Sequence, residues 1–194
     1  MKWILASASP RRKELLAKCI PQFEIVPSNA EEDCDVSISP KDLVETLAKR
    51  KAEEVANRET SRGKIVLGSD TVVSYDGKIL GKPNDEREAE EMLSQLSGKI
   101  HQVYTGVCIV YPRLDGTHGV LCDSDCTEVE FNVLSKEFIR AYIATGSPMD
   151  KAGAYGIQDG GLVKAIHGSF SNVVGLPLEL CERMIGFVRE VLNK

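Results

Sequence analysis

The stretch Leu5-Ala-Ser-Ala-Ser-Pro-Arg-Arg-Lys-Glu-Leu-Leu16 decides how the chain begins to fold. The apolar residues just before and within its start, Trp3 to Leu5, predict a short strand. Ser9 has the chemistry of a helix N-cap, and Pro10 falls at the first helical position, where a missing N–H costs nothing. We therefore predict a strand, a turn of small residues and a helix over residues 10–19.

The first turn of this predicted helix is basic. Arg11, Arg12 and Lys13 stand where the helix dipole favours acidic residues and disfavours cations. Backbone N–H groups, the hydroxyls of Ser7 and Ser9 and two guanidiniums together suit a multiply charged anion. An ordinary capped helix with a solvated basic turn fits the same residues, so the stretch by itself leaves both interpretations open.

Length and composition indicate a globular chain of 194 residues, which we interpret as a single domain over residues 1–194. The net charge of −5 argues against a general nucleic-acid surface, so an anion site has to be a local basic focus. No apolar run approaches the roughly 20 residues of a membrane span. The apolar start is interrupted by Pro10 and the basic residues too early for a signal peptide, and we expect a cytoplasmic protein.

Six cysteines, at positions 19, 34, 108, 122, 126 and 181, show neither a CxxC pair nor the spacing of a zinc site. In a reducing cytoplasm such scattered cysteines are expected to be free thiols.

The remaining pattern predicts an α/β protein with a mixed twisted sheet and flanking helices. An apolar strand at 64–67 leads to a turn at Gly68-Ser69-Asp70-Thr71, followed by a second strand at 72–75. Further helices are predicted over 40–57, 86–97 and 135–145 and from Pro177 onward, and long strands over 100–111 and 118–133.

Asp70 is the most informative acidic residue. A carboxylate between two apolar strand segments has to be satisfied by a metal, a cation or backbone donors. The pattern alone favours the plainest case, an aspartate in a turn that bonds its own backbone. The acidic residues 31–35 could share Mg²⁺ with Asp70, although by themselves they are typical of a solvated loop.

Three further side chains are candidates for ligand contacts. Lys51 follows two other basic residues, and neighbours on a helix diverge, so Lys51 can point away from a solvated basic face. Lys82 lies between a glycine and a proline, which suits a ligand contact and equally suits a lysine at the end of a hairpin. Gln158 could read the edge of a base, or simply face solvent in a loop.

Six motifs resemble those of the Maf family of nucleoside triphosphate pyrophosphatases and occur in that family's order over nearly the whole chain. They are Ser7-Ala-Ser-Pro-Arg-Arg12, Gly68-Ser-Asp-Thr-Val-Val73, Gly81-Lys-Pro83, Thr105-Gly-Val107, Asp150-Lys-Ala-Gly-Ala-Tyr-Gly-Ile-Gln158 and Ser171-Asn-Val-Val-Gly-Leu-Pro-Leu178.

The resemblance implies roles for the candidate residues. It implies a catalytic group of Asp70, Lys51 and Lys82, with Asp70 accepting the proton of the attacking water. It implies a divalent metal, Mg²⁺ or Mn²⁺, held by Asp70 and an acidic residue that we take as Glu32 rather than Glu31. The residues that it assigns to the substrate are Ser7, Ser9, Arg11, Arg12, Thr71 and Gln158, and the last three resemble the branch that hydrolyses dTTP and UTP.

The resemblance also implies an elongated two-lobed fold with a central cleft, similar to inosine triphosphate pyrophosphatases, often as a homodimer. The expected reaction releases a nucleoside monophosphate and pyrophosphate from dTTP, UTP or modified pyrimidine nucleotides, and the family is associated with septum formation. Two alternatives remain. One is a nucleotide-binding regulator of cell division with little turnover, which would need the positively charged residues that bind phosphate but no general base. The other is a phosphatase that releases orthophosphate.

Overall fold

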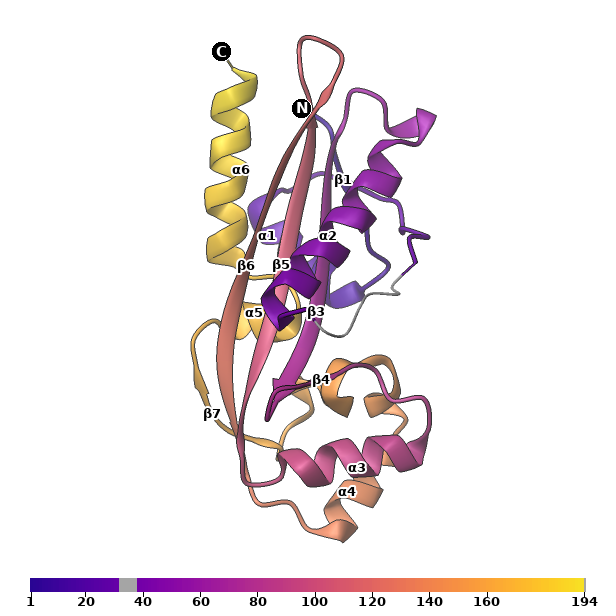
Figure 1. Ribbon diagram of the computed structural model, residues 1–194, viewed down its shortest axis with the longest axis vertical. Coiled ribbons are helices and arrows are strands. Elements are labelled where there is room, and N and C mark those ends of the chain that lie inside the picture. The colour runs from indigo at the N-terminus through magenta and orange to yellow at the C-terminus, as the bar shows by residue number, and fades with distance from the viewer. Residues whose placement is uncertain (32–37, 194) are drawn as a thin grey trace. The chain divides into compact units, whose positions relative to one another are not determined.

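A computed structural model describes residues 1–31 and 38–193, and in these residues seven strands form one mixed sheet (Figure 1). The strand order is β2-β1-β3-β5-β6-β7, with β4 paired to β3. Strand β1 is parallel to both β2 and β3, whereas β3–β4 and β6–β7 are antiparallel. The strands are β1 (Trp3–Leu5), β2 (Glu24–Ile25), β3 (Ile65–Tyr75), β4 (Lys78–Leu80), β5 (Ile100–Pro112), β6 (His118–Phe131) and β7 (Val163–His167). The predicted α/β class with a mixed sheet is confirmed.

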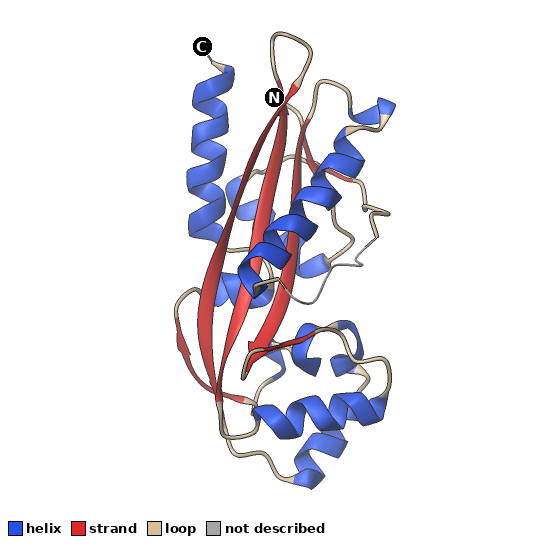
Figure 2. Ribbon diagram, viewed as in Figure 1, coloured by secondary structure: helices blue, strands red, loops and turns tan. Residues whose placement is uncertain are grey.

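The helices, drawn in blue in Figure 2, begin where the capping signals predict them. Ser9, Ser39, Asp85 and Ser135 each accept a hydrogen bond from the backbone N–H three residues later, which satisfies a donor that the helix leaves unpaired. The helices are α1 (Pro10–Cys19), α2 (Pro40–Ala56), α3 (Glu86–Leu96), α4 (Lys136–Ile143), α5 (Phe170–Val174) and α6 (Leu178–Leu192). Short 3₁₀ helices are η1 (Glu59–Ser61), η2 (Ser147–Asp150), η3 (Ala152–Ala154) and η4 (Ile157–Asp159).

The predicted turn at residues 68–71 is wrong. Strand β3 runs without interruption from Ile65 to Tyr75 and carries Asp70 in its middle. Gly68 is present because helix α2 lies against the strand, and the sequence gives no local sign of that distant contact. The interpretation of Asp70 as an aspartate in a turn is therefore wrong as well.

The expectation of free cysteines is wrong for one pair. Cys108 in β5 and Cys122 in β6 form a disulfide, with Cα atoms 4.1 Å apart. A five-residue connection joins these two neighbouring strands, so residues 14 apart in sequence meet across the sheet. Among the described residues, Cys19, Cys126 and Cys181 take no part in a disulfide.

The described chain divides into two compact units, each assembled from separate segments. Unit 1 comprises residues 1–70, 105–125 and 175–194. In unit 1, α2 packs on one face of the sheet through Ala48, Ala52 and Val55, against apolar strand residues that include Ile4 and Val66. Helices α1 and α6 contact each other.

Unit 2 comprises residues 71–104 and 126–174, and strands β3, β5 and β6 contribute to both units. Its core joins helices α3 and α4 to the sheet. His101 lies in that core with no exposed surface, in edge-to-face contact with the rings of Phe131 and Tyr155. Its Nε2 lies 2.8 Å from the hydroxyl of Tyr155, and its Nδ1 has no hydrogen-bond partner among the described residues.

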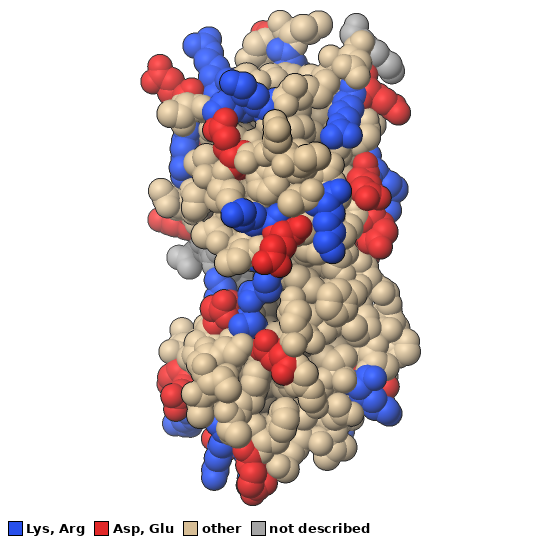
Figure 3. Space-filling model, turned by 180° about the vertical axis from the view of Figure 1, so that it is seen from behind, with Lys and Arg blue, Asp and Glu red and all other residues tan. Residues whose placement is uncertain are grey.

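Charges of both signs alternate over the face shown in Figure 3, where Lys and Arg stand beside Asp and Glu. In residues 1–31 and 38–193, no helix combines the length and the apolar composition that crossing a bilayer requires. The assignment of the whole chain to a single domain stays a prediction.

We predict that His101 makes the fold sensitive to acid. Burial lowers the pKa of His101 from 6.5 to about 4, so between these pH values the unfolded chain takes up a proton that the folded chain does not. The free energy of unfolding is therefore intact above pH 6.5 and falls by about 3 kcal/mol on acidification to pH 4.

Urea unfolding at the two pH values, compared with His101→Gln, measures this loss. The glutamine keeps a hydrogen-bonding group for Tyr155 but does not titrate. Equal losses in the two proteins would contradict the prediction.

Candidate active site

The start of helix α1 holds two serines against the backbone. Ser9 Oγ accepts from the N–H of Arg12 at 3.4 Å, and Ser7 Oγ accepts from the N–H of Ser9 at 3.2 Å. Ser7 is buried and Ser9 half-buried, and the first turn of α1 contains no acidic residue. Each hydroxyl keeps its own O–H as a donor, so the turn offers hydroxyl and helix N-terminal groups of the kind that bind phosphate.

Arg12 is held by a residue far away in sequence. Its Nε donates to the carbonyl oxygen of Gly175 at 2.9 Å, and its Nη1 lies 3.5 Å from Ser7 Oγ, at the limit of a hydrogen bond. The same carbonyl accepts from the hydroxyl of Ser69, which is fully buried, at 3.1 Å. Two of the predicted phosphate-binding residues, Ser7 and Arg12, thus lie together in unit 1, beside the strand that carries Asp70. Arg11 is half-buried in the same turn.

Helix α2 approaches the sheet at two glycines. A Cβ placed on Gly68 would lie 2.4 Å from the carbonyl oxygen of Ala48 and 2.8 Å from the backbone nitrogen of Ala52. A Cβ on Gly106 would lie 2.3 Å from the carbonyl oxygen of Val44. All three distances are far inside van der Waals contact, so only glycine permits this approach of helix to strand.

That approach brings Lys51 to Asp70. Alternate residues of a strand share a face, so the side chain of Asp70 points toward α2, on the face where a Cβ of Gly68 would lie. Lys51 Nζ donates to Asp70 Oδ1 at 2.6 Å, and only 13% and 11% of the two side chains are exposed. Lys49 and Arg50 on the same helix are exposed. The cation is therefore the partner that the structure gives to Asp70.

The predicted metal ligands are only partly described. Glu32 lies outside the described residues, and Glu31 is exposed. Within residues 1–31 and 38–193, no three acidic, histidine or cysteine side chains gather as a metal site would require. Mg²⁺ in phosphate-processing sites is commonly held by one or two carboxylates plus phosphates and waters, so the single carboxylate of Asp70 fits one position of that set.

The other predicted residues belong to unit 2. Thr71 is half-buried next to Asp70 in β3, and Lys82 and Gln158 are exposed. Two of their segments are joined, because the N–H of Gly153 donates to the carbonyl of Gly81 at 2.9 Å.

The loop that carries Gln158 is fixed at its next residue. Asp159 accepts hydrogen bonds from the hydroxyls of Tyr142 and Ser147 at 2.5 and 2.6 Å. Burial, followed by the bond to Asp159, raises the pKa of Tyr142 to about 12, so this phenol stays protonated and keeps donating.

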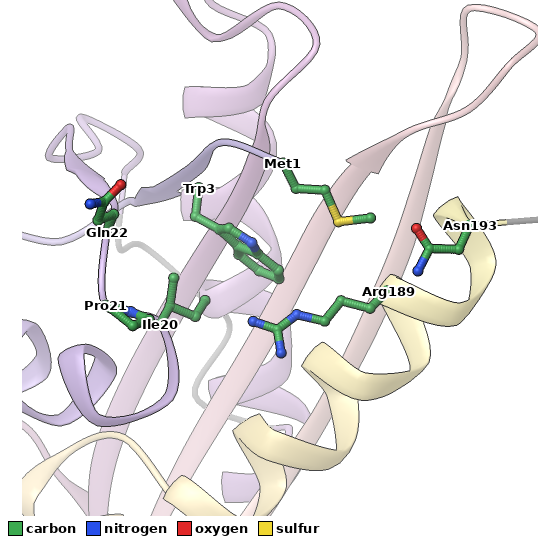
Figure 4. Close-up of a pocket in the computed structure, with 7 residues that line it drawn as sticks. All are labelled: Met1, Trp3, Ile20, Pro21, Gln22, Arg189 and Asn193. Carbon is green, nitrogen blue, oxygen red and sulfur yellow. The ribbon is translucent and has the colours of Figure 1, made fainter.

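Unit 1 also contains a shallow hollow of about 560 Å³, and Figure 4 shows the residues that line it. Trp3, Ile20 and Arg189 contribute to its lining, and none of the predicted site residues does. We therefore do not include it in the candidate site.

The fold is that of the Ham1 proteins. The structure of a Ham1 protein from Staphylococcus aureus matches with a TM-score of 0.52 at 13% identity, and a HAM1 protein from Coxiella burnetii with 0.50 at 14% identity. Each alignment covers 96% of this chain and 98% of the other.

The sequence places the chain within a particular family. The family model described as Maf-like protein matches residues 2–187, and the chain belongs to the Maf family. Relatives named dTTP/UTP pyrophosphatase include proteins from Thermococcus onnurineus, 51% identical over 95% of this chain and 97% of its own, and Thermococcus gammatolerans, 49% identical over 98% and 99%. A protein from Bacillus cytotoxicus with the same name is 51% identical over 91% and 90%.

Sequence reasoning missed Ser69 and Gly175 as parts of the site. Both residues occur in the recognised motifs, but their contact joins a side chain to a backbone carbonyl 106 residues away. The local sequence carries no pattern that signals such a bond.

We predict that Gly68→Ala destabilises the protein by about 1–3 kcal/mol, because the added methyl group meets the backbone of α2 rather than a side chain that could move. Gly186→Ala in α6 is the matched control. Its Cβ would meet nothing within 4 Å, and alanine favours a helix by up to about 1 kcal/mol. Urea unfolding of both variants checks the prediction, which fails if Gly68→Ala is as stable as the control.

We also predict that Lys51→Met costs about 3 kcal/mol of stability, because it leaves the buried Asp70 carboxylate without its cation. Lys49→Met serves as the control on the same helix, since Lys49 forms an exposed pair with Glu53 that is worth less than about 1 kcal/mol. Equal midpoints for the two variants in urea would show that the Lys51–Asp70 contact does not stabilise the fold.

Proposed function

We propose that this protein is a nucleoside triphosphate pyrophosphatase that hydrolyses dTTP and UTP to the nucleoside monophosphate and pyrophosphate. Its relatives at about 50% identity over nearly their whole length carry the name dTTP/UTP pyrophosphatase. The observation that carries the proposal within the molecule is the shielded contact between Lys51 and Asp70 in strand β3. The preceding residue of the same strand, Ser69, is linked to Arg12 through the carbonyl oxygen of Gly175.

The triphosphate is bound in this proposal by the start of helix α1. Arg11 and Arg12 offset the negative charge of the triphosphate, and the hydroxyls of Ser7 and Ser9 donate hydrogen bonds to it, at the end of the helix where an anion is favoured. A planar guanidinium suits phosphate oxygens because it can donate two parallel hydrogen bonds.

Asp70 is the proposed base. Its carboxylate orients a water molecule toward the α-phosphorus and accepts the water's proton as the bond to the pyrophosphate breaks. Lys51 offsets the negative charge of Asp70, which reduces the repulsion between this carboxylate and the triphosphate. The mechanism needs no covalent enzyme intermediate.

A divalent cation, Mg²⁺ or Mn²⁺, is part of the proposal. Asp70 would hold it together with Glu32, and when bound it would neutralise phosphate charge and stabilise the leaving pyrophosphate. The roles proposed for Lys82 with the phosphates, and for Thr71 and Gln158 with the base, rest on the family resemblance.

Product analysis tests the proposal. The purified protein with Mg²⁺ is incubated with dTTP, UTP, CTP, GTP and 7-methyl-GTP, and pyrophosphate and orthophosphate are measured separately. Pyrophosphate from dTTP and UTP is the expected result. Orthophosphate alone would instead support an ordinary phosphatase, and binding without either product would support a nucleotide-binding regulator.

Two substitutions are predicted to separate chemistry from base selection. Asp70→Asn keeps the size of the side chain but removes the base, and it should lower kcat between about 10²- and 10⁴-fold. Gln158→Ala should instead change the ratio of kcat/KM between dTTP and other nucleotides while kcat for the preferred one stays within about tenfold, the effect of a lost hydrogen bond to the base. Full turnover by Asp70→Asn together with an inactive Gln158→Ala would contradict these roles.

A further inference from the structure

The carbonyl oxygen of Gly175 joins three segments that are far apart in sequence. It accepts from Arg12 Nε, 163 residues away, and from Ser69 Oγ, 106 residues away. A carbonyl oxygen has two lone pairs and can satisfy both donors. All three residues belong to unit 1.

The backbone at Gly175 suits this double role. Its φ of 119° lies in a region that side chains disfavour, so a glycine is needed to aim the carbonyl in this direction. Ser69 has no exposed surface, and a serine hydroxyl has one proton to donate, which goes to Gly175. The direction of the C=O bond is therefore determined by two features, the backbone conformation of Gly175 and the hydrogen bond from Ser69.

The bond from Nε determines what Arg12 can offer an anion. The guanidinium is planar and rigid, so committing Nε to Gly175 sets the plane of the whole group and leaves phosphate contacts to the edge that carries the two terminal nitrogens. Nη1 on that edge lies 3.5 Å from the hydroxyl of Ser7. A lysine could not reproduce the arrangement, because its ammonium is a single point of charge.

We propose that Ser69 is a positioning residue for Arg12, acting through the carbonyl of Gly175 and thereby increasing the affinity for the triphosphate. The inference rests on the proposed function for the identity of the ligand. Ser69 directly precedes the proposed base, and because adjacent residues of a strand point to opposite faces, it acts on the face of β3 opposite to Asp70.

A double-mutant cycle distinguishes this role from a merely structural one. Binding of α,β-methylene-dTTP with Mg²⁺, in which the bond proposed to break is replaced, is measured by calorimetry for the wild type, Ser69→Ala, Arg12→Met and the double variant. Ser61→Ala is the matched control, since Ser61 is buried in the same unit and its hydroxyl has no hydrogen-bond partner among the described residues. Urea unfolding establishes that each variant is folded, and Ser69→Cys replaces Ser69→Ala if the latter is not.

The expected result is that Ser69→Ala raises Kd about fivefold in the wild-type background and less than about twofold when Arg12 is already methionine, while Ser61→Ala leaves Kd unchanged. An equal increase in both backgrounds would overturn the inference, because Ser69 would then act independently of Arg12. So would unchanged binding by Ser69→Ala, or a wild type that does not bind the analogue.

The products of dTTP hydrolysis separate this inference from the proposed function. If the cycle shows coupling but the protein releases orthophosphate, the proposed function fails and the positioning role stands. If pyrophosphate is released and the cycle shows no coupling, the proposed function stands and the positioning role fails.

Discussion

Backbone contact between helix α2 and strands β3 and β5 is the constraint on which unit 1 depends. Gly68 and Gly106 remove the two Cβ atoms that would collide with the helix backbone. The helix can then lie close enough for Lys51 to reach Asp70 with both side chains nearly enclosed. In a less polar setting than water such a pair interacts more strongly, and breaking it leaves a costly charge. A requirement of packing thus determines the electrostatics of the site.

The two faces of strand β3 make different contacts. Gly68 and Asp70 face α2, and the residue between them, Ser69, points to the other side and bonds Gly175. Because Gly175 also holds Arg12, the segment before α6 links the strand to the start of α1. The proposed base and a proposed phosphate ligand are therefore connected through one buried serine and one carbonyl, and neither residue needs to touch the substrate.

Local signals in the sequence predicted much of the fold. Capping residues such as Ser9 and Ser39 gave the helix starts because their hydrogen bonds lie within three residues. The turn assigned at Gly68 was wrong because a glycine that serves a distant helix resembles one that serves a turn. The disulfide was missed because cross-strand pairing of Cys108 and Cys122 requires knowing which strands are neighbours. The family motifs identified the candidate residues. The contact of Arg12 with the Gly175 carbonyl could be identified only from the three-dimensional structure, because the two residues are 163 positions apart.

The central claim is that water attacks the α-phosphorus of a nucleoside triphosphate at this site. Hydrolysis of dTTP in water enriched in ¹⁸O, followed by mass spectrometry of both products, tests it most directly. The label is predicted in the nucleoside monophosphate, with none in the pyrophosphate. Water oxygen forms its new bond to the α-phosphorus, and the bond that breaks joins that phosphorus to the bridging oxygen, which leaves with the pyrophosphate. Label in the pyrophosphate, or in orthophosphate, would place the attack on another phosphorus and contradict the claim.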